Sequence, residues 1–191
     1  MRHAIHRETN PDCVVHPAVI ESLTILAALG YTFDVVAVFP QHLKHITTLS
    51  ERIPTLKMMI DDLCKYPYDS DSDMAAWRDQ MAAAAQNPNV YAKISGLNTA
   101  VGKANWSAAN LQPAIDFALT QFEAHRLVFG SDWRVALLAG DYAQVVARCG
   151  SSRDLGRQCQ SLRNYYAEAV SKPLIHTEAF VYNAKDRVKR R

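Results

Sequence analysis

The chain has 191 residues, of which 49% are apolar and 21% are charged, and its formal net charge is only +2. This composition is typical of a globular protein and gives no reason to expect a nucleic acid or an anionic membrane as a partner. A complete eight-stranded βα barrel usually needs about 250 residues, so the length excludes one.

Five short apolar runs alternate with longer amphipathic stretches along the chain. The runs predict buried parallel strands at residues 2–7, 32–39, 56–63, 90–96 and 127–133. The first helix between them is expected to end at Gly30, and a second to begin after Asp73 as its N-cap. A third begins near Asn110, with Pro113 in its first turn, and residues 137–149 form another. The inward-facing helical residues are predicted to be Val19, Leu23, Leu26, Leu29, Met74, Trp77, Met81, Ala84, Ile115, Leu119 and Phe122.

The repeated order of strand and helix predicts an α/β protein with a parallel sheet and right-handed crossovers. No linker or low-complexity segment divides residues 1–170, so these residues are predicted to form one domain. Residues 171–191 lose the pattern and form a basic tail. A solvated terminus is favoured for this tail over a patch for anionic surfaces or nuclear import.

The four cysteines are scattered and include no CxxC pair, which indicates reduced thiols rather than a disulfide framework. The N-terminus lacks the apolar stretch of a signal peptide. No apolar run approaches the roughly 20 residues that span a bilayer. The sequence therefore predicts a cytoplasmic protein.

Asp132 is the strongest candidate for chemistry, because ligands of parallel α/β folds bind beyond the carboxyl ends of the strands. It follows the last run behind Gly130 and Ser131, where it could ligate a metal or take a proton from an attacking water. The alternatives are that it caps a helix that begins near Val135 or pairs with Arg134.

Asp61 and Asp62 form a second candidate after the third run. Successive strand residues point to opposite sides, so only one of the two is expected to face the centre of a barrel. A carboxylate there needs a metal or Lys65 as its partner, and a solvated loop is the alternative. His42 and His45 could share a helix face as metal ligands, but an exposed first helical turn is favoured.

Four segments also carry a resemblance to a known family. They are Arg2-His3 with Asn10-Pro11-Asp12, Phe33-Asp34 with Phe39-Pro40, Lys93-Ile94-Ser95-Gly96-Leu97, and the stretch 127–135 around Gly-Ser-Asp-Trp. In this order they resemble the amidohydrolase-related (amidohydrolase 2) proteins of the metal-dependent hydrolases, especially the sugar-lactone hydrolase branch. The resemblance covers residues 1–170 and implies a (β/α)8 TIM-type barrel that hydrolyses lactone or amide bonds at the carboxyl ends of its strands.

The resemblance implies a role for each matched residue. Asp132 matches the last-strand aspartate that activates water and ligates metal, and Asp62 stands where the family has a metal-site histidine. The residues expected to bind the substrate, a sugar lactone or a related cyclic ester or amide, are Arg2, His3, Lys65 and Trp133. One divalent metal, Zn²⁺ or Mn²⁺, is the implied cofactor, although metal dependence varies between members.

The matched segments begin at about the family's fourth strand and lack its first-strand His-x-His pair. We therefore expect a partial, N-terminally incomplete barrel of about five C-terminal βα units. Cys64 and Arg134 also stand where the family has glycine and proline. Two functions follow from this sequence: a hydrolase of the lactonase type, or an inactive truncated homologue that binds or oligomerises. In the second, another copy of the chain would cover the open sheet edges.

Overall fold

The computed structural model describes residues 1–102, 106–141 and 145. These residues contain a sheet with strands β1 (Arg2–His3), β2 (Thr32–Val35), β3 (Lys57–Ile60), β4 (Val90–Ile94) and β5 (Leu127–Phe129). The strands lie in chain order, and every neighbouring pair is parallel. An order without reversal is that of successive units of a βα barrel rather than of a doubly wound sheet. The prediction of five βα units with a parallel sheet is confirmed.

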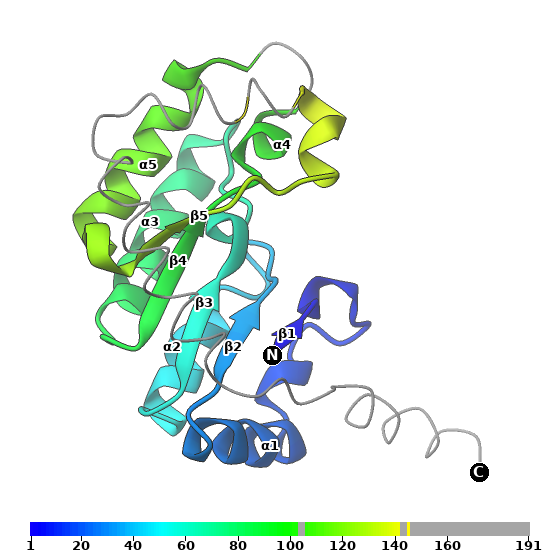
Figure 1. The fold of residues 1–191 in the computed structure, drawn as a ribbon, viewed down its shortest axis with the longest axis vertical. Helices are drawn as coiled ribbons and strands as arrows, with labels where there is room; N and C mark the ends of the chain where they lie inside the picture. The colour runs from blue at the N-terminus through cyan, green and yellow to red at the C-terminus, as the bar shows by residue number, and fades with distance from the viewer. Residues whose placement is uncertain (103–105, 142–144, 146–191) are drawn as a thin grey trace.

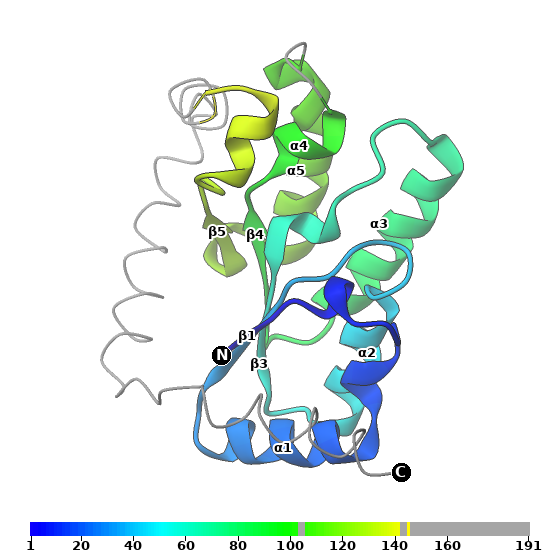
Figure 2. The same ribbon diagram turned by 90° about the vertical axis from the view of Figure 1, so that its right-hand side faces the viewer.

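Most of the described helices cover one face of this sheet. The α-helices are α1 (Pro17–Ala28), α2 (Lys44–Arg52), α3 (Asp71–Ala85), α4 (Leu97–Val101) and α5 (Ala108–Phe122). Figures 1 and 2 show α1, α2, α3 and α5 along that face, whereas α4 lies beyond the carboxyl ends of the strands. The short 3-10 helix η5 (Val135–Ala139) lies beside α4, where Asn98 Nδ2 donates to the Ala136 carbonyl at 2.9 Å. None of the described helices is long and apolar enough to cross a bilayer.

Alternation along the strands gives the two faces of the sheet different characters. The face that packs on the helices is apolar, and its buried residues include Phe33, Val35, Met58, Ile60, Val90, Ala92, Ile94 and Leu127. The opposite face carries the charged residues Arg2, Asp34 and Lys93 beside the buried apolar residues Met59 and Val128. Both faces of a doubly wound sheet are covered by helices and are apolar, so a face with these charges corresponds to the interior of a barrel.

Several helix predictions need correction at their ends. The N-cap of α3 is Ser70, whose hydroxyl accepts from the Asp73 amide, because the helix begins at Asp71. Leu29 was expected to face inward but is 56% exposed, because α1 ends at Ala28 and Leu29 is its C-cap. The other predicted inward-facing residues are buried or pack against the core. The helix predicted over 137–149 begins as η5 and falls partly outside the described residues.

A left-handed turn follows β3, which ends at Ile60 rather than at residue 63. Its residues are Asp62, Leu63, Cys64 and Lys65, with φ of 53°, 44°, 58° and 53°. Such a conformation costs roughly 1–2 kcal/mol for each non-glycine residue. Two hydrogen bonds of 2.9 Å hold it: Trp77 Nε1 donates to the Leu63 carbonyl, and the Phe39 amide donates to the Cys64 carbonyl. The turn therefore depends on buried groups distant in the sequence.

Trp77→Phe is expected to lower the free energy of unfolding by about 2 kcal/mol, since it leaves the buried Leu63 carbonyl without its indole donor. Urea denaturation of the purified chain measures this change. Trp133→Phe is the matched control: Trp133 is 59% exposed, so its replacement should shift stability by less than about 0.5 kcal/mol. Equal losses in the two variants would contradict a role of Trp77 in holding the turn.

Candidate active site

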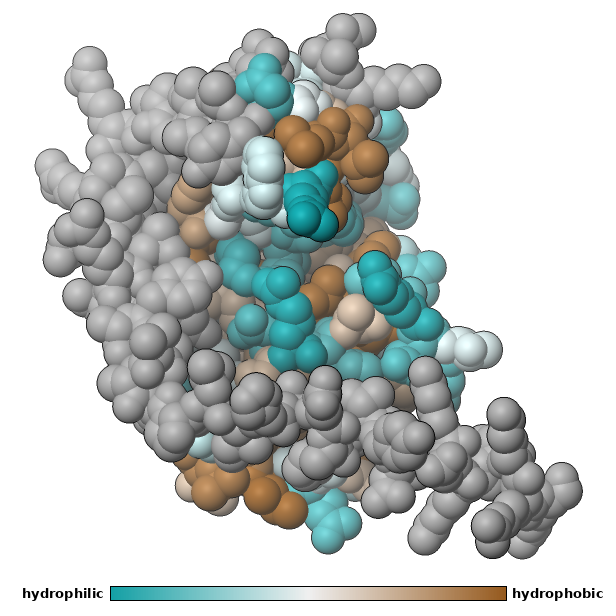
Figure 3. Space-filling model, turned by 45° about the vertical axis from the view of Figure 1, so that its right-hand side comes forward, coloured by the Kyte–Doolittle hydropathy of each residue, from teal (hydrophilic) through white to brown (hydrophobic). Residues whose placement is uncertain are grey.

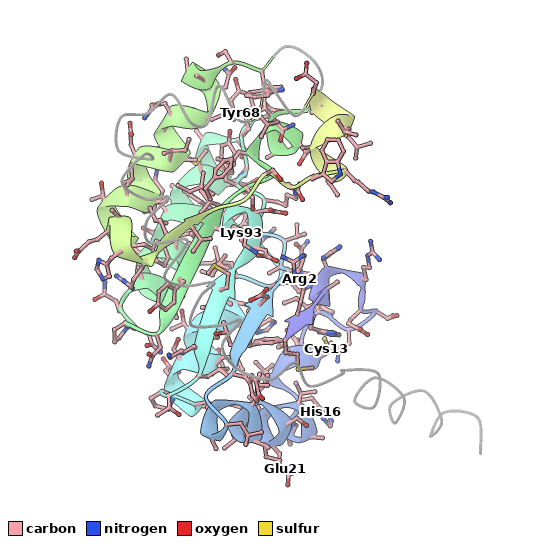
Figure 4. All side chains as sticks on the ribbon, viewed as in Figure 1. Arg2, Cys13, His16, Glu21, Tyr68 and Lys93 are labelled. Atoms are coloured by element: carbon pink, nitrogen blue, oxygen red, sulfur yellow. The ribbon has the colours of Figure 1, made fainter. Side chains whose placement is uncertain are left out.

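A charged network crosses the open face of the sheet at the carboxyl ends of the strands. The Asp61 side chain, directly after β3, is only 4% exposed and bonds to Arg2 Nη2 at 2.8 Å and to the Lys93 ammonium. Arg2 Nε also lies 3.7 Å from Asp34 Oδ2. Figure 4 labels Arg2 on β1 and Lys93 on β4, so the network joins four strands. Figure 3 shows hydrophilic side chains gathered in a hollow on this side of the molecule.

A second cluster surrounds Gly96, where β4 gives way to α4. A Cβ atom placed on Gly96 would lie 2.8 Å from Asp132 Oδ2, 2.9 Å from Lys65 Nζ and 2.9 Å from Asp62 Cγ. These side chains come from the ends of β3 and β5, on either side of β4. They therefore converge on a point that is open because residue 96 has no side chain.

Hydrogen bonds orient two of the converging groups. Asp62 Oδ1 accepts from Ser95 Oγ at 2.5 Å, and its Oδ2 lies 3.3 Å from Lys65 Nζ. The same ammonium donates to Thr99 Oγ1 at 2.9 Å and lies 3.5 Å from the Gly96 carbonyl. Lys65 is thus held between the left-handed turn after β3 and the first turn of α4. Of the two partners that the sequence left open for a carboxylate here, a metal or Lys65, Lys65 lies beside Asp62.

Asp132 differs from Asp62 in having an unpartnered oxygen. Its Oδ2 is buried and has no hydrogen-bond partner among the described residues. Burial raises the pKa of Asp132, the negative charge of Asp62 raises it further, and the Lys65 charge lowers it in part. Burial likewise raises the pKa of Asp34, against the opposing charge of Lys93. A carboxyl group with a raised pKa is a stronger base and is suited to accepting a proton from water.

The structure brings four of the six predicted site residues together at the carboxyl ends of the strands. Asp132, Asp62 and Lys65 converge on Gly96, and Arg2 belongs to the neighbouring network. His3 points elsewhere and pairs with Glu8, its Nε2 lying 3.4 Å from the Glu8 carboxylate, because neighbouring strand residues alternate sides. Trp133, next to Asp132 in the chain, is exposed, as are the apolar residues Val135, Leu137 and Leu138 of η5.

Two expectations about the acidic and histidine pairs are wrong. Both Asp61 and Asp62 make contacts on the site side, because β3 ends before them and the left-handed turn replaces strand alternation. His42 and His45 are buried rather than exposed. His45 Nε2 bonds to the Pro11 carbonyl at 3.1 Å and lies 3.0 Å from Asp12 Oδ1, so it ties α2 to an earlier loop.

The alternative in which Asp132 caps a helix is also not observed. The N-cap of η5 is Arg134, and no side chain bonds to the η5 backbone there. In the sequence, four residues of this site stand out only as parts of the segments that carry the family resemblance, with no catalytic or binding role of their own: Asp34, Lys93, Ser95 and Gly96. The available signal was the presence of Lys93 inside an apolar run, since a buried ammonium group requires an acidic partner.

The arrangement of Asp62 and Asp132 does not fit a divalent metal ion. The Lys65 ammonium lies against Asp62 and on the same side of Gly96 as Asp132, where a second cation would be repelled. Within the described ranges, no three His, Cys, Asp or Glu side chains lie together as a set of metal ligands. The predicted metal-ligand role of the two carboxylates has no support from this geometry.

Gly96→Ala is expected to destabilise the fold by about 2–3 kcal/mol, because alanine is strained at φ +60° and its Cβ would crowd three site residues. Gly102→Ala is the comparison variant without crowding, because a Cβ there meets nothing within 4 Å. Its backbone, with φ 68° and ψ 128°, lies outside the left-handed helical region, so alanine there should cost about 1–3 kcal/mol of backbone strain alone. Thermal and urea unfolding measure both variants, and a loss of less than about 1 kcal/mol in Gly96→Ala would mean that the site tolerates the added methyl group.

Comparison with known proteins identifies related sequences. Residues 10–158 match the family model described as Amidohydrolase. The chain is 33% identical over 141 residues to an L-fucono-1,5-lactonase of Burkholderia ambifaria, which covers 72% of this chain and 48% of the relative. It is 31% identical over 168 residues to an L-fucono-1,5-lactonase of Burkholderia multivorans, and this match covers 80% of this chain and 55% of the relative. The chain thus spans about half the length of these curated relatives.

The fold has a close counterpart among solved structures. An amidohydrolase from Burkholderia multivorans, crystallised with bound zinc, superposes with a TM-score of 0.79 at 27% identity. The superposition covers 90% of this chain and 64% of the solved one. The same protein with bound HEPES gives a TM-score of 0.75.

Proposed function

Because this chain belongs to the amidohydrolase family, we propose that it hydrolyses a sugar lactone at the site around Gly96, with Asp132 as the general base. The observation that carries this proposal is the buried, unpartnered Asp132 oxygen, which lies beside a lysine at the carboxyl ends of parallel strands. The two L-fucono-1,5-lactonases among its relatives support a lactone, rather than an amide, as the substrate.

The proposed reaction needs one water and one base. Asp132 takes a proton from a water molecule while the oxygen of that water attacks the carbonyl carbon of the lactone. The resulting oxyanion collapses, the bond between the carbonyl carbon and the ring oxygen breaks, and the ring oxygen leaves with the proton from Asp132. The product is an open-chain hydroxy acid, and the ionised Asp132 is regenerated.

The zinc in the solved relative supports a divalent metal as a cofactor within the family. In this chain the ammonium of Lys65 lies where such an ion would meet Asp62 and Asp132. The proposed steps therefore use side chains alone. The Zn²⁺ or Mn²⁺ that the resemblance implies is therefore not part of the reaction proposed for this chain.

We also propose a domain range, a cellular location and a second copy of the chain as a partner. The barrel domain is proposed to span residues 1–170, a range that includes the family match to residue 158. The predicted basic tail, 171–191, lies outside the described residues. A cytoplasmic location and a second copy that covers the sheet edges also remain proposals, whereas a small-molecule lactone ligand is supported by the lactonase relatives.

The test is an assay of acid release from L-fucono-1,5-lactone by the purified chain, against the spontaneous rate. We expect saturable hydrolysis that is lost in Asp132→Asn and retained in Asp79→Asn, an equivalent change at an exposed position on α3. The corresponding lactam should not be hydrolysed. Lactone binding without hydrolysis would overturn the proposal in favour of an inactive, ligand-binding homologue, and the absence of both would overturn it outright.

A further inference from the structure

We propose that the ammonium group of Lys65 takes the place that a divalent metal ion would occupy, and that it binds the carbonyl oxygen of the substrate directly. This inference rests on the proposed lactone hydrolysis and adds a second catalytic residue to it. In such a hydrolase the Lys65 side chain, rather than a metal ion, polarises the carbonyl group of the substrate.

The first support is the fixed position of Lys65. Its backbone lies in the left-handed turn, and its Nζ is held by Asp62 at 3.3 Å and by Thr99 Oγ1 at 2.9 Å. An ammonium has three N–H donors, and the third contact, to the Gly96 carbonyl, is long at 3.5 Å. A substrate oxygen can therefore replace that contact without breaking the bonds that orient the lysine.

The second support is access, which separates Lys65 from the other cations of the site. The Lys65 side chain is 30% exposed, whereas that of Lys93 is 9% exposed and is bonded to Asp61. Arg2 is exposed, but its guanidinium group is engaged by Asp61 and lies close to Asp34. Lys65 is thus the ammonium that a substrate in the hollow can reach next to the proposed base.

The third support is the charge balance around Gly96. Two carboxylates, Asp62 and Asp132, converge there with one ammonium. Asp62 is bound by Ser95 and Lys65 and serves to position the lysine, which leaves Asp132 free to act on water. During attack the negative charge that forms on the carbonyl oxygen is stabilised by the Lys65 ammonium, and it returns to the carbonyl when the ring bond breaks.

The kinetic test compares Lys65→Met with Lys44→Met, which removes an exposed lysine on α2. We expect Lys65→Met to lower kcat for the lactone by about 10²–10³-fold, the range for loss of an oxyanion donor, and Lys44→Met to leave it unchanged. Thr99→Val keeps the charge but removes the oxygen that orients it, so it should lower kcat about tenfold with less effect on folding. EDTA should leave the wild-type rate unaffected, and abolition of activity by EDTA would overturn the proposal.

Calorimetry with zinc alone provides a readout that does not depend on turnover. Wild-type chain should show no zinc site that requires Asp132, whereas Lys65→Met, which leaves two carboxylates without their cation, should gain one that Asp132→Asn removes. A zinc site in the wild type that Asp132→Asn abolishes would overturn the replacement of metal by Lys65. If the wild type does not hydrolyse the lactone, the proposed function fails, but this measurement still decides whether Lys65 excludes the metal.

Discussion

Asp61→Asn is expected to lower the free energy of unfolding by about 3–5 kcal/mol, the range for breaking a buried ion pair from one side. The Asp61 carboxylate is the shared partner of Lys93 and Arg2. Its loss leaves the Lys93 ammonium buried without that neutralising contact. It also releases Arg2, which ties the two-residue edge strand β1 to the centre of the sheet. Urea denaturation at neutral pH measures the loss.

Two further variants test whether the loss arises from the unpaired charge. Adding Lys93→Met to Asp61→Asn removes the unpaired Lys93 ammonium, so the double variant should be more stable than Asp61→Asn alone. Asp34→Asn should change stability by less than about 1 kcal/mol, because burial already raises the pKa of Asp34 and disfavours its charge. If Asp34→Asn proved as damaging as Asp61→Asn, the network would not be centred on Asp61.

The periodicity of the sequence predicted every strand of the sheet but not where the strands end. The apolar run 56–63 continues past Ile60, yet β3 stops there because Asp62 to Lys65 adopt a left-handed conformation. Non-glycine residues rarely take positive φ, so no local pattern announces such a turn. It forms because Trp77 and Phe39 donate hydrogen bonds to it from elsewhere in the fold. Tertiary contacts, rather than local propensity, determine this segment.

The sequence indicates which residues follow the strands but not which distant residues they contact. Asp132 stands out because it follows the last strand, and Asp61 and Asp62 because they follow the third, with nearby Lys65 as one candidate partner. The contacts of Asp61 with Arg2 and Lys93 join distant parts of the chain and depend on the register of four strands. Which charged side chains come into contact depends on the register of the strands, and the sequence alone does not give that register.

Asp132→Asn is expected to lower kcat for lactone hydrolysis by about 10³-fold, within the range for loss of a general base. This corresponds to about 4 kcal/mol of transition-state stabilisation. The amide has nearly the same shape and removes only the ability to accept the proton, so KM should change little. The wild-type rate should rise with pH through a pKa above the ordinary aspartate value of 3.8, because the pKa of Asp132 is raised. A pH–rate profile of kcat/KM measures this dependence, and a rate in Asp132→Asn equal to the wild type would remove Asp132 from the mechanism.

The same variant should be no less stable than the wild type at neutral pH, which separates loss of catalysis from loss of fold. A carboxyl group whose pKa is raised by folding binds its proton more tightly in the folded state, so its contribution to stability is greatest at acid pH. That contribution declines as the pH rises from about 4 through the folded pKa, where the buried charge forms. The amide introduced by Asp132→Asn has no proton to lose, so the variant should escape this decline and match the wild type only below pH about 4. Asp34, whose pKa is also raised, contributes the same dependence to both proteins, so their difference in stability against pH reports Asp132 alone.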